Sequence, residues 1–412
     1  MLGERIRKLR KQKKVTLEEL AGSELTKGML SLIENNKANP SMESLAYIAQ
    51  RLEVDVSQLL NEVSVVELRE VLDEAEKLFN IRKENLNENL SDKYTKLIHL
   101  IEPYISKLHQ GYEAARLLEI YGRSLYGEEK EEWKGPIDLA AKLYDQMNIT
   151  PKRASIGIFR GTVHFIDHNY EKALEVLLFE RSEIEEKFAY IDPITRLDLD
   201  YHEAILYFAV GNIASAKRVM DDAIAFSKEN KMFYLIDDLY RLAAASAMMS
   251  EDVELFEYYL MKLKQYAEFS DDKGSKLSYQ IFNIESLISV KHDYKSALEI
   301  INHHLEDPEF TTPLKQWFFL EKGKALHGLG EYEEAIHYFD ETEIPFYHHH
   351  PFDLTLFYLK DTYKALCYVE LGNQNKALSA AKTAVENFES LPGSPYKDFS
   401  NSTYHNIAGK GK

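Results

Sequence analysis

A run of histidines is a candidate site for chemistry in this sequence, because neighbouring imidazoles bind metal ions and transfer protons. His348, His349 and His350 form a run between Pro345 and Pro351. Side chains of consecutive residues point in different directions, and the flanking prolines indicate a connection between helices. The run therefore predicts a solvated loop and no metal site.

Other catalytic patterns are incomplete. His202 and Glu203 have no second histidine four residues after the first, as a zinc-protease helix requires. Cys367, the single cysteine, has apolar neighbours and is predicted to be packed rather than nucleophilic. Neither glycine-rich phosphate loop, G-x-x-x-x-G-K-S/T or G-x-G-x-x-G, occurs. The sequence predicts no enzyme activity and no cofactor.

Positive charge is concentrated at one end of an acidic chain. The net charge of the 412 residues is −18, yet residues 1–61 hold ten Lys and Arg against eight Asp and Glu, a local balance of +2. Seven of those cations are among the first fourteen residues. A basic head on an acidic body is expected when only the head contacts DNA phosphates.

Composition indicates where the protein works. One cysteine excludes an internal disulfide framework and fits a reducing cytoplasm. No run approaches eighteen uncharged apolar residues, and no apolar segment follows the basic N-terminus. We therefore expect a cytoplasmic protein with no membrane segment.

Residues 1–61 are expected to form a five-helix domain. Helical periodicity covers 3–12, and Thr16 with Glu19 forms a capping box before the second helix. Thr26 precedes a third helix that ends at Asn35, and Pro40-Ser41 precedes a fourth. Residues 54–60 predict a last short helix. Residues 62–94, charged and helical in pattern, are expected to form a linker helix.

Residues 95–390 carry an internal repeat. A small or polar residue, an often aromatic residue, and an alanine three positions later recur in steps of 43, 40, 41, 38 and 42 residues, and the third copy is degenerate. Small residues stand twelve positions before most of these alanines, where two helices must approach closely. This is the tetratricopeptide pattern. The copies begin at Asn169, Asn212, Asp252, Asp293, Glu331 and Asn373, and the small residues are Gly161, Ala204, Ala244, Gly323 and Ala365.

The predicted fold is therefore all-α. A five-helix domain at 1–61 is followed by the linker at 62–94, a right-handed superhelix of tetratricopeptide repeats at 95–390, and a C-terminal tail at 391–412. No alternating pattern is long enough to predict a sheet.

The head resembles the lambda-repressor-like, or Xre-type, helix-turn-helix family. The matching residues are Ile6-Arg7-x-Leu9-Arg10, Thr16-Leu17-Glu18-Glu19-Leu20-Ala21, Thr26-Lys27, Ile33-Glu34-Asn35 and Asn39-Pro40-Ser41.

The resemblance implies that the helix starting at Lys27 enters the major groove of DNA. It implies that Asn35 and Lys37 approach phosphates and that Arg10 pairs with Glu34. Lys27 and Ser31 are the candidates for base contact, and the whole DNA-binding set is Thr16, Lys27, Gly28, Ser31, Asn35 and Lys37. The sequence departs from the family in a shorter turn between the second and third helices. It also departs at Gly28, where a base-reading side chain is common, and at Leu17, where a Gln often contacts DNA.

The order of a helix-turn-helix head and long tetratricopeptide repeats resembles the peptide-pheromone receptors of Gram-positive bacteria. This is the Rgg–Rap–NprR–PlcR–PrgX group, with a length most similar to the NprR branch. The resemblance implies that a short signalling peptide binds the concave face of the repeats. It also implies a homodimer in which the peptide controls how the heads meet DNA.

Superposing the repeats on the tetratricopeptide pattern predicts which side chains face this groove. Aromatic rings would take peptide side chains, and Arg241 could hold a carboxylate through two hydrogen bonds. Phe282 and Trp317 could instead pack between repeats. The predicted peptide-binding residues are Asp198, Tyr201, Asp238, Arg241, Tyr279, Phe282, Asn283, Ser286, Trp317 and Lys324.

An alternative function stays open. Members of this group also sequester or dephosphorylate a response-regulator protein through the helices that precede the groove, which here correspond to residues near 65–150. The sequence gives neither the operator, nor the peptide, nor whether the peptide activates or represses.

Overall fold

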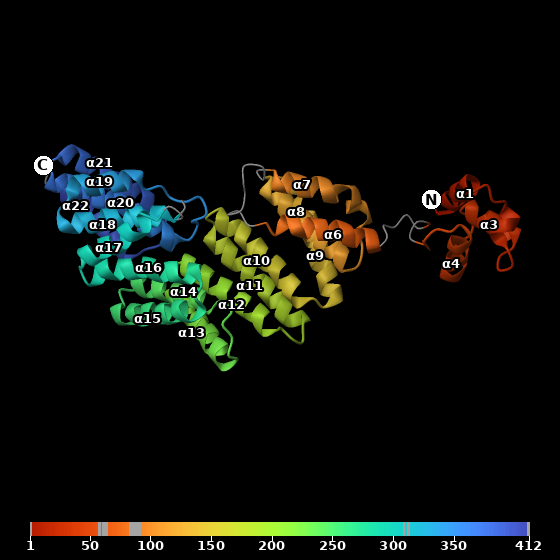
Figure 1. The fold of residues 1–412 in the computed structure, drawn as a ribbon, viewed down its shortest axis with the longest axis horizontal. Coiled ribbons are helices and arrows are strands. Elements are labelled where there is room, and N and C mark those ends of the chain that lie inside the picture. Colours follow the sequence, from red (N-terminus) through yellow and green to blue (C-terminus); the bar gives the residue numbers. More distant parts are fainter. Residues whose placement is uncertain are drawn as a thin grey trace. The chain divides into compact units, whose positions relative to one another are not determined.

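The computed structural model describes residues 2–56, 59, 65–81, 92–307, 310 and 314–409. Within these ranges the chain is helical and has no strand, so the all-α prediction is confirmed. The chain divides into two compact units, Met1–Ile156 and Gly157–Lys412, and we describe each by itself. Figure 1 follows the elements along the chain.

The head contains four described helices, and its apolar residues form a separate core. The predicted capping box is present, because Thr16 Oγ1 accepts from Glu19 N at 3.1 Å and Thr16 N donates to Glu19 Oε2 at 2.7 Å. The short helix expected at 54–60 lies largely outside the described residues. The four helices are α1 (Leu2–Gln12), α2 (Leu17–Ala21), α3 (Lys27–Glu34) and α4 (Met42–Arg51).

The rest of the first unit is a helical body. Its elements are α6 (Val65–Phe79), α7 (Lys93–Ile101), the 3-10 turn Glu102–Lys107, α8 (Tyr112–Gly127), the 3-10 turn Glu131–Trp133, α9 (Lys134–Met147) and the start of α10 (Thr150–Ile166).

The structure differs from the prediction of a single linker helix at 62–94. Its helix α6 ends at Phe79, and residues 82–91 lie outside the described ranges. The apolar side of α6 packs against α7 and α8, where Leu72 is 8% exposed and Ala75 is fully buried. Because α6 buries this side, it belongs to the helical body.

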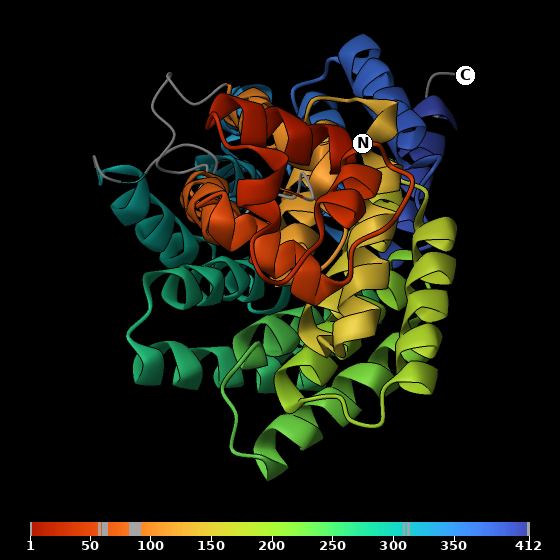
Figure 2. The ribbon, with the colours of Figure 1, turned by 90° about the vertical axis from the view of Figure 1, so that its right-hand side faces the viewer.

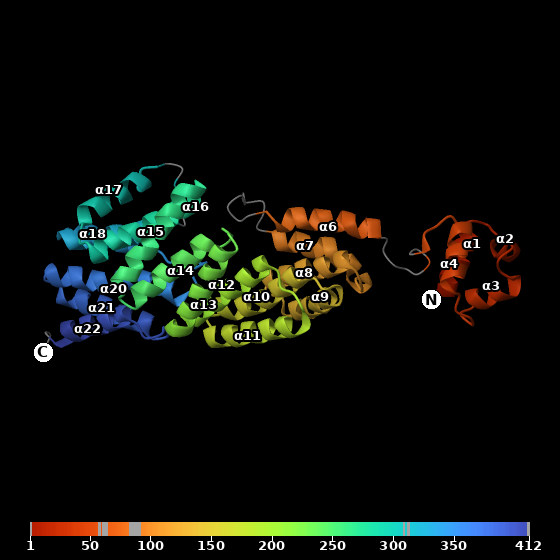
Figure 3. The ribbon, with the colours of Figure 1, turned by 90° about the horizontal axis from the view of Figure 1, so that it is seen from below.

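The second unit is a series of antiparallel helix pairs, as the views along and across it show (Figure 2, Figure 3). After α10 and α11 (Tyr170–Lys187), the pairs are α12 (Pro193–Ala209) with α13 (Ile213–Glu229) and α14 (Ile236–Met249) with α15 (Val253–Ser270). Next come α16 (Lys273–Glu285), continued by a π-helical turn at Ser286–Val290, with α17 (Tyr294–Leu305), then α18 (Lys315–Leu329) with α19 (Tyr332–Glu341). The last pair is α20 (Pro351–Glu370) with α21 (Gln374–Phe388), followed by α22 (Pro395–Gly409).

The repeat register predicted from the sequence is confirmed. The first residue of every copy is the N-cap of the second helix of a pair, and in all copies but the one at Glu331 its side chain accepts a hydrogen bond from the backbone. The alanines of the copies are fully buried. At Gly323 a Cβ would lie 2.5 Å from the ring of Phe339, so only glycine allows α18 and α19 to approach this closely.

The segment predicted as a C-terminal tail, 391–412, is helical from Pro395 to Gly409. This helix, α22, packs against α20 and α21 (Figure 3). Ser400 is fully buried, and its Oγ lies 2.7 Å from Oγ1 of Thr362. The boundaries at 61, 94 and 390 stay predictions of domain limits.

Candidate DNA-binding face and ligand cavity

The outer face of α3 carries the predicted base-reading residues. Leu30, Ile33 and Glu34 are buried on one side of this helix. Lys27 and Gly28 are exposed on the other side and Ser31 is half-buried, all within about a third of a turn at 100° per residue. A Cβ at Gly28 would meet nothing closer than Thr26 Oγ1 at 4.0 Å, so this position leaves space beside the helix.

The remaining DNA-binding candidates lie around α3. Asn35 is its C-cap and donates from Nδ2 to Ser31 O at 2.8 Å. Lys37 and Thr16 are exposed. The hydroxyl of Thr16 is engaged in the capping box, so a DNA contact would have to share it.

Lys27 already has a partner in the free protein. Its Nζ lies 3.0 Å from Glu18 Oε1, and the two side chains are 60% and 73% exposed. An exposed pair of this kind contributes only about 0–1 kcal/mol, so Lys27 can exchange Glu18 for another acceptor.

The structure brings Arg10 and Glu34 together, as the resemblance implies. Arg10 Nε donates to Glu34 Oε1 at 2.6 Å and Nη2 donates to Oε2 at 2.9 Å, while Nη1 donates to Val15 O at 2.9 Å. Glu34 is 3% exposed. Next to this pair, a Cβ on Gly3 would lie 2.0 Å from Ile33 O. A two-pronged ion pair and a close helix contact therefore fix α1 against α3.

A cavity of about 430 Å³ lies within the second unit. It is lined by side chains of α10, α12, α14, α16, α18, α20 and the connection before α20. The structure places four of the predicted peptide-binding residues in its wall: Tyr201, Arg241, Phe282 and Trp317. Its volume and mostly apolar wall with few charged groups are typical of sites for small organic ligands.

Arg241 is the one arginine among the residues that line this cavity in the described part of the chain. Its Nη2 donates to Asp238 Oδ1 at 2.5 Å, and its side chain is 43% exposed. Burial raises the pKa of Asp238 more than the neighbouring Arg241 lowers it, so this pKa lies above its ordinary value. Of this pair, only Arg241 lines the cavity.

The prediction of a solvated histidine loop is wrong. All three histidines are half-buried and line the cavity. Trp317 Nε1 donates to His348 Nε2 at 3.1 Å, and His350 Nε2 lies 3.2 Å from the carbonyl oxygen of Ile205. Burial lowers the pKa of His350, so the ring is neutral at pH 7. Contacts with residues far away in the sequence hold the loop in the cavity wall.

The other predicted groove residues do not line the cavity. Ser286 is fully buried and donates to Glu257, and Asp198 accepts from the Tyr234 hydroxyl at 2.7 Å. Lys324 is 2% exposed and held in an ion cluster. The six residues outside the cavity wall are Asp198, Asp238, Tyr279, Asn283, Ser286 and Lys324.

Sequence reasoning missed three acidic residues in the cavity wall, Asp353 and the two glutamates Glu285 and Glu321. Lys324 Nζ donates to both carboxylates, and lies 3.0 Å from Glu321 Oε2. Glu285 stands twelve residues before Ala297, where other copies of the repeat have glycine or alanine. A glutamate at a position where the other copies have a small residue is the sequence signal that could have identified Glu285.

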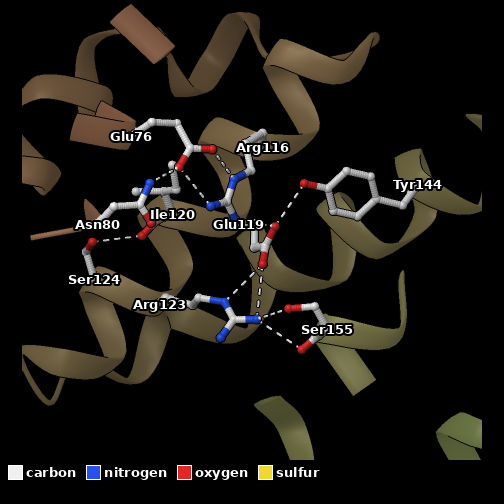
Figure 4. Close-up of polar contacts among 9 residues, drawn as sticks. All are labelled: Glu76, Asn80, Arg116, Glu119, Ile120, Arg123, Ser124, Tyr144 and Ser155. Atoms are coloured by element: carbon white, nitrogen blue, oxygen red, sulfur yellow. Dashed lines mark hydrogen bonds and ion pairs between the residues drawn. The ribbon is translucent and has the colours of Figure 1, made fainter. Parts of the chain in front are cut away.

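The first unit holds a different buried ion cluster, centred on Glu119 (Figure 4). Glu119 Oε2 lies 2.8 Å from Arg116 Nη1 and accepts from the Tyr144 hydroxyl at 2.9 Å, while Arg123 Nη2 lies 3.0 Å from Oε1. Burial raises the pKa of Glu119, but the two arginines lower it more, so the carboxylate stays charged. Because Arg116 also pairs with Glu76, the cluster joins α6, α8 and α9.

Cys367 is fully buried, and burial raises the pKa of its thiol to about 12, as expected for a packed side chain. Within the described ranges no group of His, Cys, Asp and Glu side chains is arranged to hold a metal ion. None of the helices described is long and apolar enough to cross a membrane.

Fold and sites define a class of protein, a helix-turn-helix DNA-binding domain joined to a body of helical repeats. A family model for a helix-turn-helix domain matches residues 3–65. The chain is 41% identical over 75 residues to the HTH-type transcriptional regulator SinR of Bacillus licheniformis, which is 18% of this chain and 68% of that protein. The chain belongs to the family of HTH-type transcriptional regulators through this domain.

Two solved structures are similar to part of the chain. PlcR of Bacillus thuringiensis, solved with the peptide PapR7 and DNA, is 17% identical with a TM-score of 0.34, covering 68% of this chain and 98% of that one. The pheromone receptor Rgg2 of Streptococcus dysgalactiae is 14% identical with a TM-score of 0.30, covering 68% and 98%. These relatives are regulators and receptors. No role of a residue in this chain is inferred from them. Similarity to the NprR branch stays a prediction.

Proposed function

We propose that this protein is a DNA-binding transcription regulator whose activity is set by a short signalling peptide bound in the cavity of the second unit. One observation carries the proposal. The cavity combines a reachable guanidinium, Arg241, with the aromatic side chains of Tyr201 and Trp317. A guanidinium binds a carboxylate through two parallel hydrogen bonds, and aromatic rings take apolar peptide side chains.

DNA binding is assigned to the head. Lys27 and Ser31 on the outer face of α3 would contact bases, and Lys37 with the exposed cations of α1 would contact phosphates. The protein acts as a homodimer, so that two heads read two half-sites. A regulator of this kind works beside the chromosome, in the cytoplasm, and needs neither a cofactor nor catalysis.

Control by the peptide requires different affinities for two arrangements of the dimer. A peptide that binds both arrangements equally shifts nothing, however tightly it binds. The peptide named with PlcR and the pheromone named with Rgg2 support a signalling ligand for this architecture, although they say nothing of the sequence that fits this cavity.

The first experiment isolates the ligand and then the DNA. Full-length protein purified under native conditions from its host is weighed by native mass spectrometry, where an added mass of heptapeptide size is expected. The same protein then selects duplexes from a random DNA pool, with and without the released peptide. A protein that selects no duplex at low salt would end the DNA-binding proposal.

Lys27→Ala and Ser31→Ala are compared with Lys217→Ala, an exposed lysine of α13 outside the head. Only the first two should change the selected sequences. Adding a purified response-regulator protein to the titration tests the alternative partner. Binding to that protein with no DNA selection would replace the proposal.

A further inference from the structure

Two carboxylates share one ammonium group at the contact between α16 and α18. Lys324 Nζ donates to Glu285 and to Glu321, and the three side chains are only 2%, 6% and 3% exposed. Ser289 also donates to Glu285. Within the described part of the chain, Oε2 of Glu321 accepts no hydrogen bond, although it lies 3.0 Å from Lys324 Nζ.

Lys324 lines a different cavity from the one that contains Arg241, a second cavity of about 510 Å³ that Glu285 also lines. Glu285 and Glu321 line the cavity that also contains Arg241, whereas Lys324 does not. Tyr363 of α20 and Tyr396 of α22 act on the cluster electrostatically, in addition to the groups of α16 and α18. The cavity therefore has the two carboxyl groups in its wall, and their common cation belongs to the lining of the second cavity.

Helix pairing does not explain the second carboxylate. One ion pair, Glu285 with Lys324, joins α16 to α18 and balances the buried charge. Adding Glu321 brings a second carboxyl group out of water and places it beside the Glu285 carboxylate, which favours the neutral carboxyl unless a further cation is present. The backbone also departs from the α-helix here, because the π-helical turn begins directly after Glu285. Such turns are frequent at functional sites.

We propose that Glu321 binds a cationic group of the ligand, a primary ammonium, in addition to the Lys324 ammonium that it shares with Glu285. The inference rests on the proposed function, since the ligand is taken to be a peptide. A peptide presents a primary ammonium at its N-terminus or on a lysine side chain. With Arg241 in the same cavity, the site has places for both a ligand cation and a ligand carboxylate.

Affinity selection from peptide pools tests the proposal with full-length protein. The probes are random heptapeptide pools that contain one lysine, in three forms: unmodified, N-terminally acetylated, and with the lysine ε-acetylated. Peptides that stay with the protein after size exclusion are identified by mass spectrometry. We expect one acetylation to lower retention roughly tenfold or more, which is the usual strength of a charged hydrogen bond. The form that loses binding identifies the ammonium.

Glu321→Gln keeps the shape of the side chain and removes its charge, so it should abolish the preference for the unmodified peptides. Because Glu285 and Lys324 remain paired, the variant should melt at or above the temperature of the wild type. Glu203→Gln is the matched control, a buried carboxylate 2.8 Å from Arg181 that does not line the cavity. It should retain the preference.

The outcomes separate the two proposals. Peptides retained equally in all three forms, or a Glu321→Gln variant with unchanged preference, would overturn the ammonium site and leave peptide binding intact. A Glu321→Gln variant that melts well below the wild type would assign the carboxylate a structural role. If the wild type retains no peptide from any pool, both proposals fail.

Discussion

Arg241 Nη2 lies 2.5 Å from Asp238 Oδ1, one turn earlier on α14, so the cation in the cavity wall already has a carboxylate as its partner. Pairs three residues apart on a helix contribute about 0.2–0.5 kcal/mol when exposed, and this arginine is 43% exposed. The pair is too weak to explain the position of Arg241 by stability alone. Tyr201 also hydrogen-bonds to the guanidinium and Asp353 acts on it electrostatically, so a ligand carboxylate would bind the remaining donors.

Arg241→Ala should therefore abolish peptide binding and leave the melting temperature nearly unchanged. Calorimetric titration of the native peptide, beside a thermal melt, measures both. Arg218→Ala is the matched control, because Arg218 makes a similar exposed pair with Asp222 on α13. Equal affinity in wild type and Arg241→Ala would exclude Arg241 as the anchor and favour the aromatic wall at Trp317.

Lys27 and Lys37 should affect DNA binding differently. Lys27→Ala removes a side chain that is proposed to contact a base and should alter sequence preference by about 1–3 kcal/mol at that base. Lys37→Ala removes a side chain that is proposed to contact a phosphate, so it should weaken binding to all sequences and lower the salt slope by about one. Fluorescence anisotropy with two duplexes over a range of salt concentrations separates the effects. Uniform weakening by both variants would contradict the role given to Lys27.

Arg10 and Glu34 should be energetically coupled. Removing either partner leaves the other partly buried and unpaired, which costs roughly 3 kcal/mol at full burial. Arg10→Met and Glu34→Gln should each speed hydrogen exchange in α1 and α3, and the double variant should recover part of the loss. Strictly additive effects would mean that the ion pair contributes nothing.

Glu119 should be more important for stability than a surface carboxylate of the same helix. Glu119→Gln removes the acceptor shared by Arg116 and Arg123 and should destabilise the first unit by roughly 3 kcal/mol. Since the pKa of Glu119 is lowered, its contribution is present above the ordinary carboxyl pKa and is lost as pH falls below it. Hydrogen exchange in α6 and α8 at pH 7 and at lower pH tests both points.

Glu113 gives the comparison for that experiment. Its partner Arg69 is 67% exposed, so Glu113→Gln should cost only about 0–1 kcal/mol. Equal losses in the two variants would mean that burial does not strengthen the Glu119 cluster.

Local signals explain what the sequence could predict. Capping residues, the alanines and the small residues of the repeat act within one helix pair, so the register was found correctly from Asn169 to Asn373. The Arg10–Glu34 pair was inferred from a resemblance to a known family. Both kinds of inference need no knowledge of how distant pairs pack.

Long-range contacts explain what was missed. His350 contacts Ile205, 145 residues away, and Lys324 turns from the predicted groove towards Glu285, 39 residues away. The helix α22 buries polar side chains such as Ser400 and Thr403, so its pattern does not indicate a packed face. In each case the partner, rather than the residue's own neighbourhood, decides where the side chain lies.

The ammonium site makes peptide binding depend on pH. Burial and the nearby Glu285 raise the pKa of Glu321 to about 8, so its carboxyl holds a proton at pH 7 in the free protein. Binding an ammonium requires the charged carboxylate, and the proton must leave. Affinity should therefore rise as pH increases from 6 to 8, by at most about tenfold per pH unit, and level off above 8.

Stability should change with pH in the opposite direction. Because the pKa of Glu321 in the folded protein lies above its ordinary value of 4.5, this group stabilises the fold at low pH. Its contribution declines as pH rises from the ordinary value and is lost through pH 8. Over this pH range the melting temperature of the wild type should fall further than that of Glu321→Gln. Other titrating groups are the same in both proteins, so the difference between the two melting temperatures reports Glu321 alone.

Proton release itself is the most direct measurement. Calorimetric titration at pH 6.5 in phosphate and in Tris, whose ionisation enthalpies differ, should show about one proton released per peptide bound to the wild type and almost none for Glu321→Gln. Burial lowers the pKa of two histidines in the cavity wall, His349 and His350, which favours their neutral forms. The same proton release in both proteins would assign the titration to another group and remove Glu321 from the site.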